Sequence, residues 1–348
     1  MGTLVPFLAL LTLAQWTVDA GEDYTITIRM DKAVSDRPDD LVCIGRKLEP
    51  DESYIVEFTP HASKATVHHL MVYGCHLPAV SDFEDPWKCY DGDGTHSNHS
   101  VCGDGDRQIF FAWALDAPEK TLPDGVGFRV AGDTGINYLV IQLHYAKMFP
   151  EGVTDSSGVT LHMTKTRPPQ QAGYIVVGTW GHIPPQMPDF HMESMCLYER
   201  NYTVYPIGYR THAHNLGVVT SGYRIRDHQW TEIGRMSPQL PQTFYDVSNP
   251  GMDLEPGDLL AGRCTMNSMA RQDRTKIGPT NHDEMCNFYI MYSTYYQGHL
   301  VTDYCFQDGN SFHWSDNFAQ EEIPPNASAL NGIPGADEVR EKFGLKPR

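Results

Sequence analysis

Apolar and polar residues alternate along much of this 348-residue chain, for example at residues 24–28 and 53–58. A two-residue period is typical of strands with one buried face, whereas stretches with the helical period of about 3.6 residues are scarce here. The 24 Pro and 30 Gly residues favour many short elements separated by turns. We therefore expect an all-β fold, and an α/β fold is the weaker alternative.

The alternating pattern is interrupted at residues 167–173, which include Pro168 and Pro169. Two prolines cannot sit in a central ladder, so we interpret this stretch as a linker. It separates two predicted domains, at residues 21–167 and 168–320. Pro and small polar residues dominate beyond residue 321. We predict that residues 321–348 form an extended or disordered tail, with at most a short helix near Asp337 to Phe343.

The N-terminus predicts a secretory route. An apolar run at residues 4–14 is followed by Val18-Asp19-Ala20, which resembles a signal cleavage site, so residues 1–20 are expected to be a signal peptide. The run is too short to span a bilayer, and no other segment is long enough, so we expect no transmembrane segment. The protein is then expected in the lumen of the secretory pathway, in secretory granules or outside the cell.

Cysteines and glycosylation motifs fit that route. The eight cysteines favour four disulfides in an oxidising compartment, although their spacing alone leaves the pairing open. Four precede the linker and four follow it, which supports two separately crosslinked domains. Candidate N-glycosylation sites occur at Asn98, Asn201 and Asn326.

The formal net charge of −18 argues against a nucleic-acid-binding protein, because an acidic surface repels phosphate backbones. Most of the 16 histidines are expected to be ordinary surface or hydrogen-bonded residues, and only a few stand out by their spacing.

The first notable histidines are the adjacent His68 and His69, in an apolar segment. Neighbouring side chains on a flat strand point to opposite faces, so one metal could bind both only at a strand end, at a bulge or through different ring nitrogens. Two separately hydrogen-bonded histidines are the alternative. His144 lies in a second apolar segment and shares a face with Gln142. The interpretation of His144 as a metal ligand is strengthened only if it joins His68 and His69 at one site.

The second histidine motif is His212-Ala213-His214. Both rings would lie on one face of a strand, an arrangement that suits Zn, Cu, Fe or Ni. Arg210 lies two residues before His212, so its side chain would point to the same face of the strand. Because a cation does not help to bind a metal, we expect Arg210 to bind an anionic ligand. An ion pair with a structural carboxylate is the alternative.

The segment after Glu284 predicts another functional face. By parity, Met285, Asn287 and Tyr289 share one side of a strand, while Cys286 and Phe288 turn into the core. A buried Met is more often core filler, but a thioether ligand specifically favours Cu(I).

Together these segments resemble the ascorbate-dependent type II copper monooxygenases, and in particular the members that hydroxylate peptidylglycine. The resemblance covers residues 23–305. It is carried by residues 66–69, 122–130, 142–145, 209–217, 221–224 and 283–287.

This resemblance implies two consecutive antiparallel β-sandwich domains, jelly-roll-like, each with one copper ion on the faces that meet. The residues that match the ligands of the electron-transfer copper are His68, His69 and His144. Those that match the ligands of the oxygen-activating copper are His212, His214 and Met285. The residues that match the site for the carboxylate of the peptide are Arg210, Asn287 and Tyr289.

The resemblance also implies a disulfide pairing: Cys43–Cys89, Cys75–Cys102, Cys196–Cys305 and Cys264–Cys286. Some members of the family have a fifth disulfide. Here Ser156 stands where one of its cysteines would be, and no early cysteine remains to pair with it. Leu41 replaces a tyrosine that contacts substrate in the family, which affects the expected side-chain preference rather than the chemistry.

The implied activity is hydroxylation of the α-carbon of the C-terminal glycine of peptides, with O₂ as co-substrate, ascorbate as reductant and two copper ions per chain. The expected partners are glycine-extended peptides and a separate lyase that completes amidation, because the sequence has no room for a lyase domain. One alternative is a related hydroxylase of catecholamine-like molecules, although Arg210 favours a carboxylate substrate. Another is a secreted protein that binds copper or peptide without catalysis.

Overall fold

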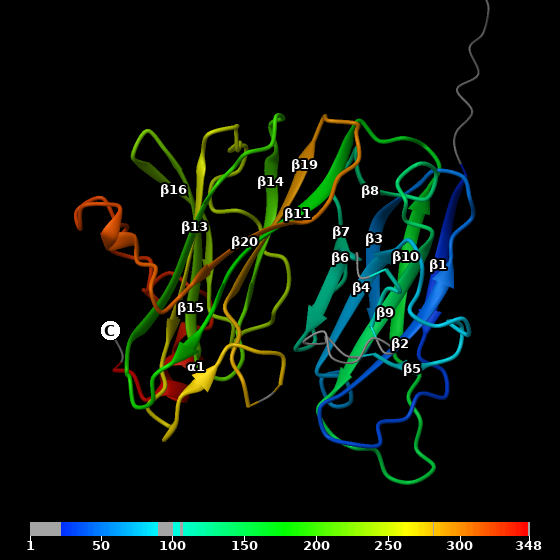
Figure 1. Cartoon of the computed structure of the whole chain (residues 1–348), viewed down its shortest axis with the longest axis horizontal. Helices are drawn as coiled ribbons and strands as arrows, with labels where there is room; N and C mark the ends of the chain where they lie inside the picture. The colour runs from blue at the N-terminus through cyan, green and yellow to red at the C-terminus, as the bar shows by residue number, and fades with distance from the viewer. Residues whose placement is uncertain (1–21, 90–99, 105–106, 281, 347–348) are drawn as a thin grey trace, which may run out of the picture.

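The computed structural model describes residues 22–89, 100–104, 107–280 and 282–346. The predicted signal peptide and the motif at Asn98 lie outside these residues. The described residues form twenty strands, one short 3₁₀ helix and one α-helix, so the predicted all-β class is confirmed (Figure 1). None of the helices in the described part of the chain has the length and apolar character of a membrane span.

The N-terminal half forms a sandwich of two sheets. The strands are β1 (Asp23–Arg29), β2 (Asp40–Lys47), β3 (Ser53–His61), β4 (His69–Cys75), β5 (Trp87–Lys88), β6 (Arg107–Ala114), β7 (Lys120–Thr121), β8 (Val126–Val130), β9 (Tyr138–Tyr145) and β10 (Gly158–Thr164). One sheet has the order β1-β10-β3-β8, with β7 beside β3, and the other has the order β5-β2-β9-β4-β6. Phe58 of β3 and Phe111 of β6 stack between them, with ring centroids 4.7 Å apart.

The C-terminal half repeats this architecture. Its strands are β11 (Gln170–Trp180), β12 (His182–Ile183), β13 (Phe190–Leu197), β14 (Tyr205–His212), β15 (Gly217–Arg226), β16 (Gln229–Met236), β17 (Leu259–Met266), β18 (Thr275–Lys276), β19 (Asn287–Thr294) and β20 (Asp303–Asp308). One layer consists of β11, β19, β14 and β20, and the other has the order β13-β17-β15-β16. Gly222 of β15 permits close packing of the layers, because a Cβ there would lie 2.2 Å from the ring of Phe288.

Most strand pairs are antiparallel, as predicted, but β11 makes two parallel pairings. It pairs with β20, and its first residues pair with β8 through Gln170↔Val126 and Gln171↔Gly127. The second pairing joins the two halves in one nine-stranded sheet. Pro168 and Pro169 of the predicted linker precede β11, whereas residues 170–173 already belong to this strand. The linker predicted from the sequence pattern therefore extends too far at its C-terminal end.

The predicted extended or disordered tail at 321–348 is wrong for its described residues, 321–346. The buried side chains of this segment are Ile323, Ala327, Leu330, Ile333, Ala336 and Val339. They recur every three or four residues and pack on the C-terminal half. The short helix predicted near its end is confirmed as α1 (Ala336–Phe343).

Every cysteine is in a disulfide, and the pairs are those implied by the family resemblance: Cys43–Cys89, Cys75–Cys102, Cys196–Cys305 and Cys264–Cys286. No disulfide links the two halves. Four disulfides indicate an oxidising compartment such as the secretory pathway. Asn201 and Asn326 are both exposed, and their glycosylation stays a prediction.

Candidate metal centres and substrate pocket

The first candidate centre consists of His68, His69 and His144, whose ligand atoms lie within 4.8 Å of one another. His69 is the first residue of β4 and pairs with His144 of β9. His68 precedes the strand, and its backbone N–H donates to the carbonyl oxygen of His144 at 2.8 Å. A strand end is one of the arrangements that the sequence required if adjacent histidines were to face one site.

The ring nitrogens that converge are the Nδ1 atoms. His69 Nδ1 lies 3.4 Å from His68 Nδ1 and 3.3 Å from His144 Nδ1. On its other side, His144 Nε2 lies 3.1 Å from Asp39 Oδ1. Because Nε2–H donates to this carboxylate, the lone pair of His144 is left on Nδ1, facing the other two rings.

Burial keeps this cluster neutral. Burial and the neighbouring His144 lower the pKa of His68 to about 4. Burial, His144 and His68 together hold the pKa of His69 well below its ordinary value. Burial also lowers the pKa of His144, although Asp39 opposes the shift. At neutral pH the three imidazoles therefore carry free lone pairs, which is the form that binds a transition metal.

The second candidate centre consists of His212, His214 and Met285. His212 Nε2 lies 3.2 Å from Met285 Sδ, and the two histidine rings are 5.4 Å apart between centroids. His214 Nδ1–H donates to the carbonyl oxygen of Asp283 at 3.1 Å, which leaves its Nε2 for a ligand. Burial, together with Arg210, holds the pKa of His212 well below its ordinary value. The structure thus brings two imidazoles and a thioether together.

Gln242 orients this second centre, and no pattern in the sequence pointed to it. Its Oε1 accepts hydrogen bonds from His212 Nδ1 at 2.6 Å and from Arg210 at 3.1 Å. Its Nε2 donates to the carbonyl oxygens of Ala213 and Pro238. The amide therefore fixes the tautomer of His212, with Nε2 as the free nitrogen. Gln242 lies in a proline-rich loop without periodicity, so pattern analysis could not single it out.

Glu284 is the second residue that sequence reasoning missed. It is fully buried, and its carboxylate accepts hydrogen bonds from the backbone N–H groups of His214, Leu216 and Met285. Burial raises the pKa of Glu284, whereas His214 and the three N–H donors oppose the rise. One side chain thus ties the segment of His214 to the segment of Met285, although they are distant in sequence. Its position directly before Met285 was the only available signal.

Strand register places the predicted carboxylate-binding residues together. Across the β14–β19 pair, Arg210 lies opposite Tyr289 and His212 lies opposite Asn287. The Arg210 Cζ atom is 5.2 Å from the centroid of the Tyr289 ring. Cys286 and Phe288 point the other way, into buried clusters, as the parity analysis predicted.

Arg210 is a buried cation without a buried anion. Its side chain is 2% exposed, and its Nε donates to the Gln242 carbonyl oxygen at 2.8 Å. No carboxylate among the described residues forms an ion pair with it, so the predicted alternative of a structural ion pair has no support. Burial lowers the pKa of Arg210, but it stays charged at any physiological pH. Such a charge calls for an anionic ligand.

Arg210 faces a cavity of about 190 Å³ between the two halves, here called the substrate pocket. No Asp or Glu side chain of the described residues lines it. The lining residues are Leu41, His69, Met71, Tyr73, Arg107, Ile109, Val176, Arg210, His212, Pro279, Met285, Asn287, Tyr289, Tyr304 and Phe306. Leu41, the predicted point of departure from the family, is therefore part of the pocket wall.

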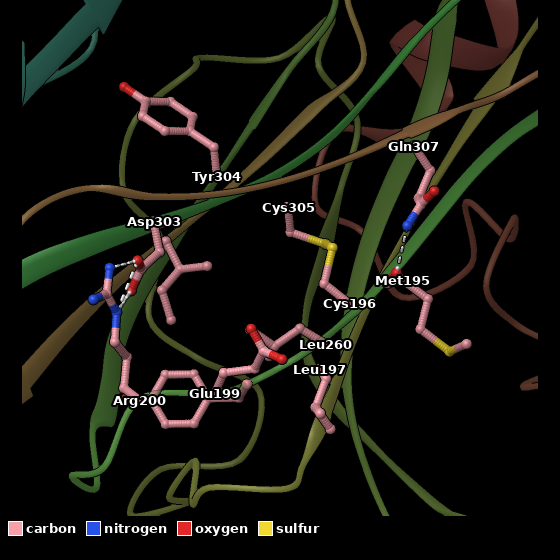
Figure 2. Close-up of a pocket in the computed structure, with 12 residues that line it drawn as sticks. Met195, Cys196, Leu197, Glu199, Arg200, Leu260, Asp303, Tyr304, Cys305 and Gln307 are labelled. Atoms are coloured by element: carbon pink, nitrogen blue, oxygen red, sulfur yellow. Dashed lines mark hydrogen bonds and ion pairs between the residues drawn. A yellow bond between two sulfur atoms is a disulfide. The ribbon is translucent and has the colours of Figure 1, made fainter.

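A larger cavity of about 680 Å³ is lined by residues of β20 together with residues of β11, β13 and β17 (Figure 2). The Cys196–Cys305 disulfide lies among its lining residues, and Arg200 forms an ion pair with Asp303 there. Along β20, Asp303, Cys305 and Gln307 line this cavity, Phe306 lines the substrate pocket, and Tyr304 lines both. Among the described residues, none of those that line the larger cavity is a histidine.

The chain matches known proteins over both halves. Residues 26–151 match the family "Copper type II ascorbate-dependent monooxygenase, N-terminal domain", and residues 170–318 match the corresponding C-terminal domain.

Individual relatives agree with this match. The chain is similar to the "Peptidyl-glycine alpha-amidating monooxygenase A" of Xenopus laevis, with 42% identity over 293 residues, which is 82% of this chain and 30% of that protein. It is 42% identical over 274 residues to the mouse "Peptidyl-glycine alpha-amidating monooxygenase", covering 78% of this chain and 27% of that one. The human "DBH-like monooxygenase protein 1" is 26% identical over 262 residues, covering 70% and 42%.

The matched region thus spans less than a third of the length of the amidating relatives. The residues of both candidate centres and of the substrate pocket lie within the regions matched by the family models, 26–151 and 170–318. On this evidence the chain belongs to the copper type II ascorbate-dependent monooxygenase family.

Proposed function

We propose that this protein hydroxylates the α-carbon of the C-terminal glycine of peptides and so gives peptidyl-α-hydroxyglycine, the first step of peptide amidation. The observation that carries the proposal is Arg210, a buried cation that lacks an anionic partner among the described residues and faces the pocket beside His212 and Met285. A peptide that ends in a free carboxylate supplies that anion. The amidating relatives support the same substrate class.

The residues of both centres fit copper. Three neutral imidazoles whose Nδ1 atoms converge suit copper in either oxidation state, so His68, His69 and His144 would hold one ion. His212, His214 and Met285 would hold the second, and their thioether favours Cu(I). When bound, the two ions supply one-electron redox chemistry and the activation of O₂. Two ions per chain, rather than one, is part of this proposal.

The side chains of the protein position the substrate. Arg210 binds the terminal carboxylate, and Asn287 and Tyr289 flank it on the adjacent strand. This places the glycine α-carbon next to the His212 and Met285 side chains. Fixing a reacting atom in this way lowers the entropic part of the barrier without any proton transfer. The pocket walls, including Leu41, Met71 and Ile109, would contact the residues that precede the glycine.

Oxygen uptake with three substrates tests this function. The copper-loaded protein with ascorbate is given an N-acetylated peptide ending in glycine, its C-terminal amide, or phenethylamine. We expect uptake and a product heavier by one oxygen atom only with the first. Turnover of the amine would favour the catecholamine-type alternative, and uptake at the peptide-free rate in all three would favour a non-catalytic protein.

The proposed function also implies the partners of the protein and the compartment in which it acts. The partners are glycine-extended peptides in the secretory pathway, in granules or outside the cell, and a lyase activity cleaves the hydroxyglycine product. Accumulation of this product at mildly acidic pH distinguishes hydroxylation alone from complete amidation.

A further inference from the structure

A second cavity of about 190 Å³ lies between the two candidate metal centres. Here it is called the intercentre cavity. His68 and His69 line it from the first centre, and His212 and His214 line it from the second. His69 and His212 also line the substrate pocket, so the two cavities share these two rings. The peptide site proposed above does not use the intercentre cavity.

One lysine near the end of the described chain supplies a cation to the wall of the intercentre cavity. Lys342 of α1 lines it, and its Nζ donates to Gln239 Oε1. Gln239 Nε2 in turn donates to the carbonyl oxygens of His214 and Gly217. No Asp or Glu of the described residues lines this cavity. Metal cations bound by the histidines beside it would add to the positive charge of Lys342, so the cavity would favour a small anion.

Packing of α1 decides where Lys342 points. Ala336 and Val339 are buried in a hydrophobic core of the C-terminal half, which fixes one face of the helix. Lys342 lies three residues after Val339, and Gly344 ends the helix in a left-handed conformation, with φ 62°. The lysine is therefore held over the cavity by an ordered element, although its side chain stays exposed to solvent.

We propose that the intercentre cavity binds the ascorbate monoanion, with Lys342 as its charge partner. The proposal rests on the ascorbate dependence of the family and, for the reaction that consumes the electrons, on the proposed function. Ascorbate is small and singly charged, and its hydroxyl groups can bond to the side-chain amide of Asn215 in the wall. A site between the centres allows one kind of reductant to serve both of them.

The stoichiometry is balanced. Each ascorbate monoanion releases one electron and one proton and leaves as the ascorbyl radical anion. Two of them, with O₂ and the glycine C–H bond, give one C–OH bond, one water and two ascorbyl radicals. No further oxidant or reductant is needed.

Binding to the fully reduced protein tests the proposal without turnover. The full copper-loaded chain is reduced anaerobically, desalted and titrated with ascorbate by calorimetry, in the absence of peptide. Ascorbate cannot reduce it further, so the titration reports binding alone. We expect Lys342→Gln to raise the Kd three- to tenfold and Lys342→Arg to stay near wild type. Lys47→Gln removes an exposed lysine of β2 outside both cavities and should have no effect.

Reduction kinetics supply the second readout. Loss of the Cu(II) signal in anaerobic EPR should require three- to tenfold more ascorbate for half-maximal rate in Lys342→Gln, while reduction by uncharged hydroquinone stays within twofold of wild type. Wild-type affinity for ascorbate in Lys342→Gln would overturn the proposal. So would an equal loss with both reductants, because that would indicate only a displaced helix. Neither measurement uses a peptide, so failure of the proposed peptide hydroxylation would leave both results interpretable.

Discussion

At the scale of single residues, the site depends on side chains whose burial is costly. Arg210 and Glu284 are buried ionisable side chains, and each has a specific task. Glu284 is satisfied by backbone N–H groups. Arg210 has only neutral partners in the described structure, namely Gln242 and the ring of Tyr289. An incoming carboxylate would offset the free-energy cost of burying the Arg210 charge without an anion.

We predict that Arg210→Gln lowers kcat/KM for glycine-ended peptides about ten- to a hundredfold, because a charge-assisted hydrogen bond contributes roughly 1.5–3 kcal/mol. Preference for the free acid over the peptide amide should largely disappear. Copper content should not change, and the Tm should stay the same or rise, because an unpaired buried charge opposes folding. Steady-state kinetics with both peptides and a thermal melt measure this. Intact acid-over-amide discrimination in the variant would remove Arg210 from the substrate site.

We also predict that the reduced, copper-loaded protein shows a copper–sulfur contribution in X-ray absorption, and that Met285→His abolishes it. The reason is the thioether 3.2 Å from His212 Nε2. Met71→Leu is the matched control, because Met71 also lines the substrate pocket without belonging to either centre. A sulfur contribution that survives in Met285→His would show that the second centre is assigned wrongly.

At the scale of elements, sequence parity predicted much of the site. It grouped Met285, Asn287 and Tyr289 and placed Arg210 with His212, and the β14–β19 register then brought the two groups together. Parity could not predict that register, because which strands pair depends on the whole sheet. Nor could it find Gln242, whose loop has no period. The tail was misjudged for a similar reason: its apolar residues are separated by prolines and glycines that suggest disorder in isolation.

One ionic cluster connects elements of the N-terminal half. Glu52 accepts hydrogen bonds from Tyr54 of β3, Arg129 of β8 and Arg167 at the domain junction. Burial alone would raise the pKa of Glu52, but these hydrogen bonds outweigh it and lower the pKa from 4.5 to about 2. The pKa is lower in the folded state, so its stabilising contribution is present above pH 4.5 and is lost as the pH falls towards 2.

Glu52→Gln should therefore lower the free energy of unfolding at pH 7 by about 1.5–3 kcal/mol, the usual range for hydrogen bonds to a charged group. The difference from wild type should shrink steadily between pH 4.5 and 3. Urea unfolding at a series of pH values measures it, with Glu49→Gln as an exposed control. A difference that is constant across this range would mean that the charge of Glu52 is not what stabilises the fold.

At the scale of the whole molecule, the two halves are joined more firmly than two predicted domains and a linker suggest. They share a sheet through β8 and β11, and one hydrophobic core includes residues of both halves. Tyr174 of β11 is the clearest link. It is 1% exposed and packs on Phe128 and Phe244, with ring centroids 5.1 and 5.4 Å away. Both cavities of the functional site lie in this junction, so its rigidity determines how the metal centres face each other.

The Tyr174 hydroxyl also forms a hydrogen bond at an irregular point of the β4–β6 pairing in the N-terminal half. The β4–β6 register shifts between Val72 and Tyr73, which pair with Phe111 and Ile109 and leave Phe110 outside the ladder. Tyr174 Oη donates to the Phe110 carbonyl oxygen at 2.7 Å. A buried carbonyl without a partner costs roughly 1–3 kcal/mol, so Tyr174→Phe should destabilise the protein by about that amount.

Because the hydrogen bond from Tyr174 to Phe110 crosses the junction, we expect one cooperative transition in calorimetry, with its midpoint lowered for both halves together. Disulfide-intact protein should be used, and Tyr198→Phe is the control, since its hydroxyl bonds within the C-terminal half, to the carbonyl oxygen of Tyr202. Two separate transitions in the wild type, with Tyr174→Phe moving only one of them, would show that the halves fold independently and that the shared sheet does not couple them.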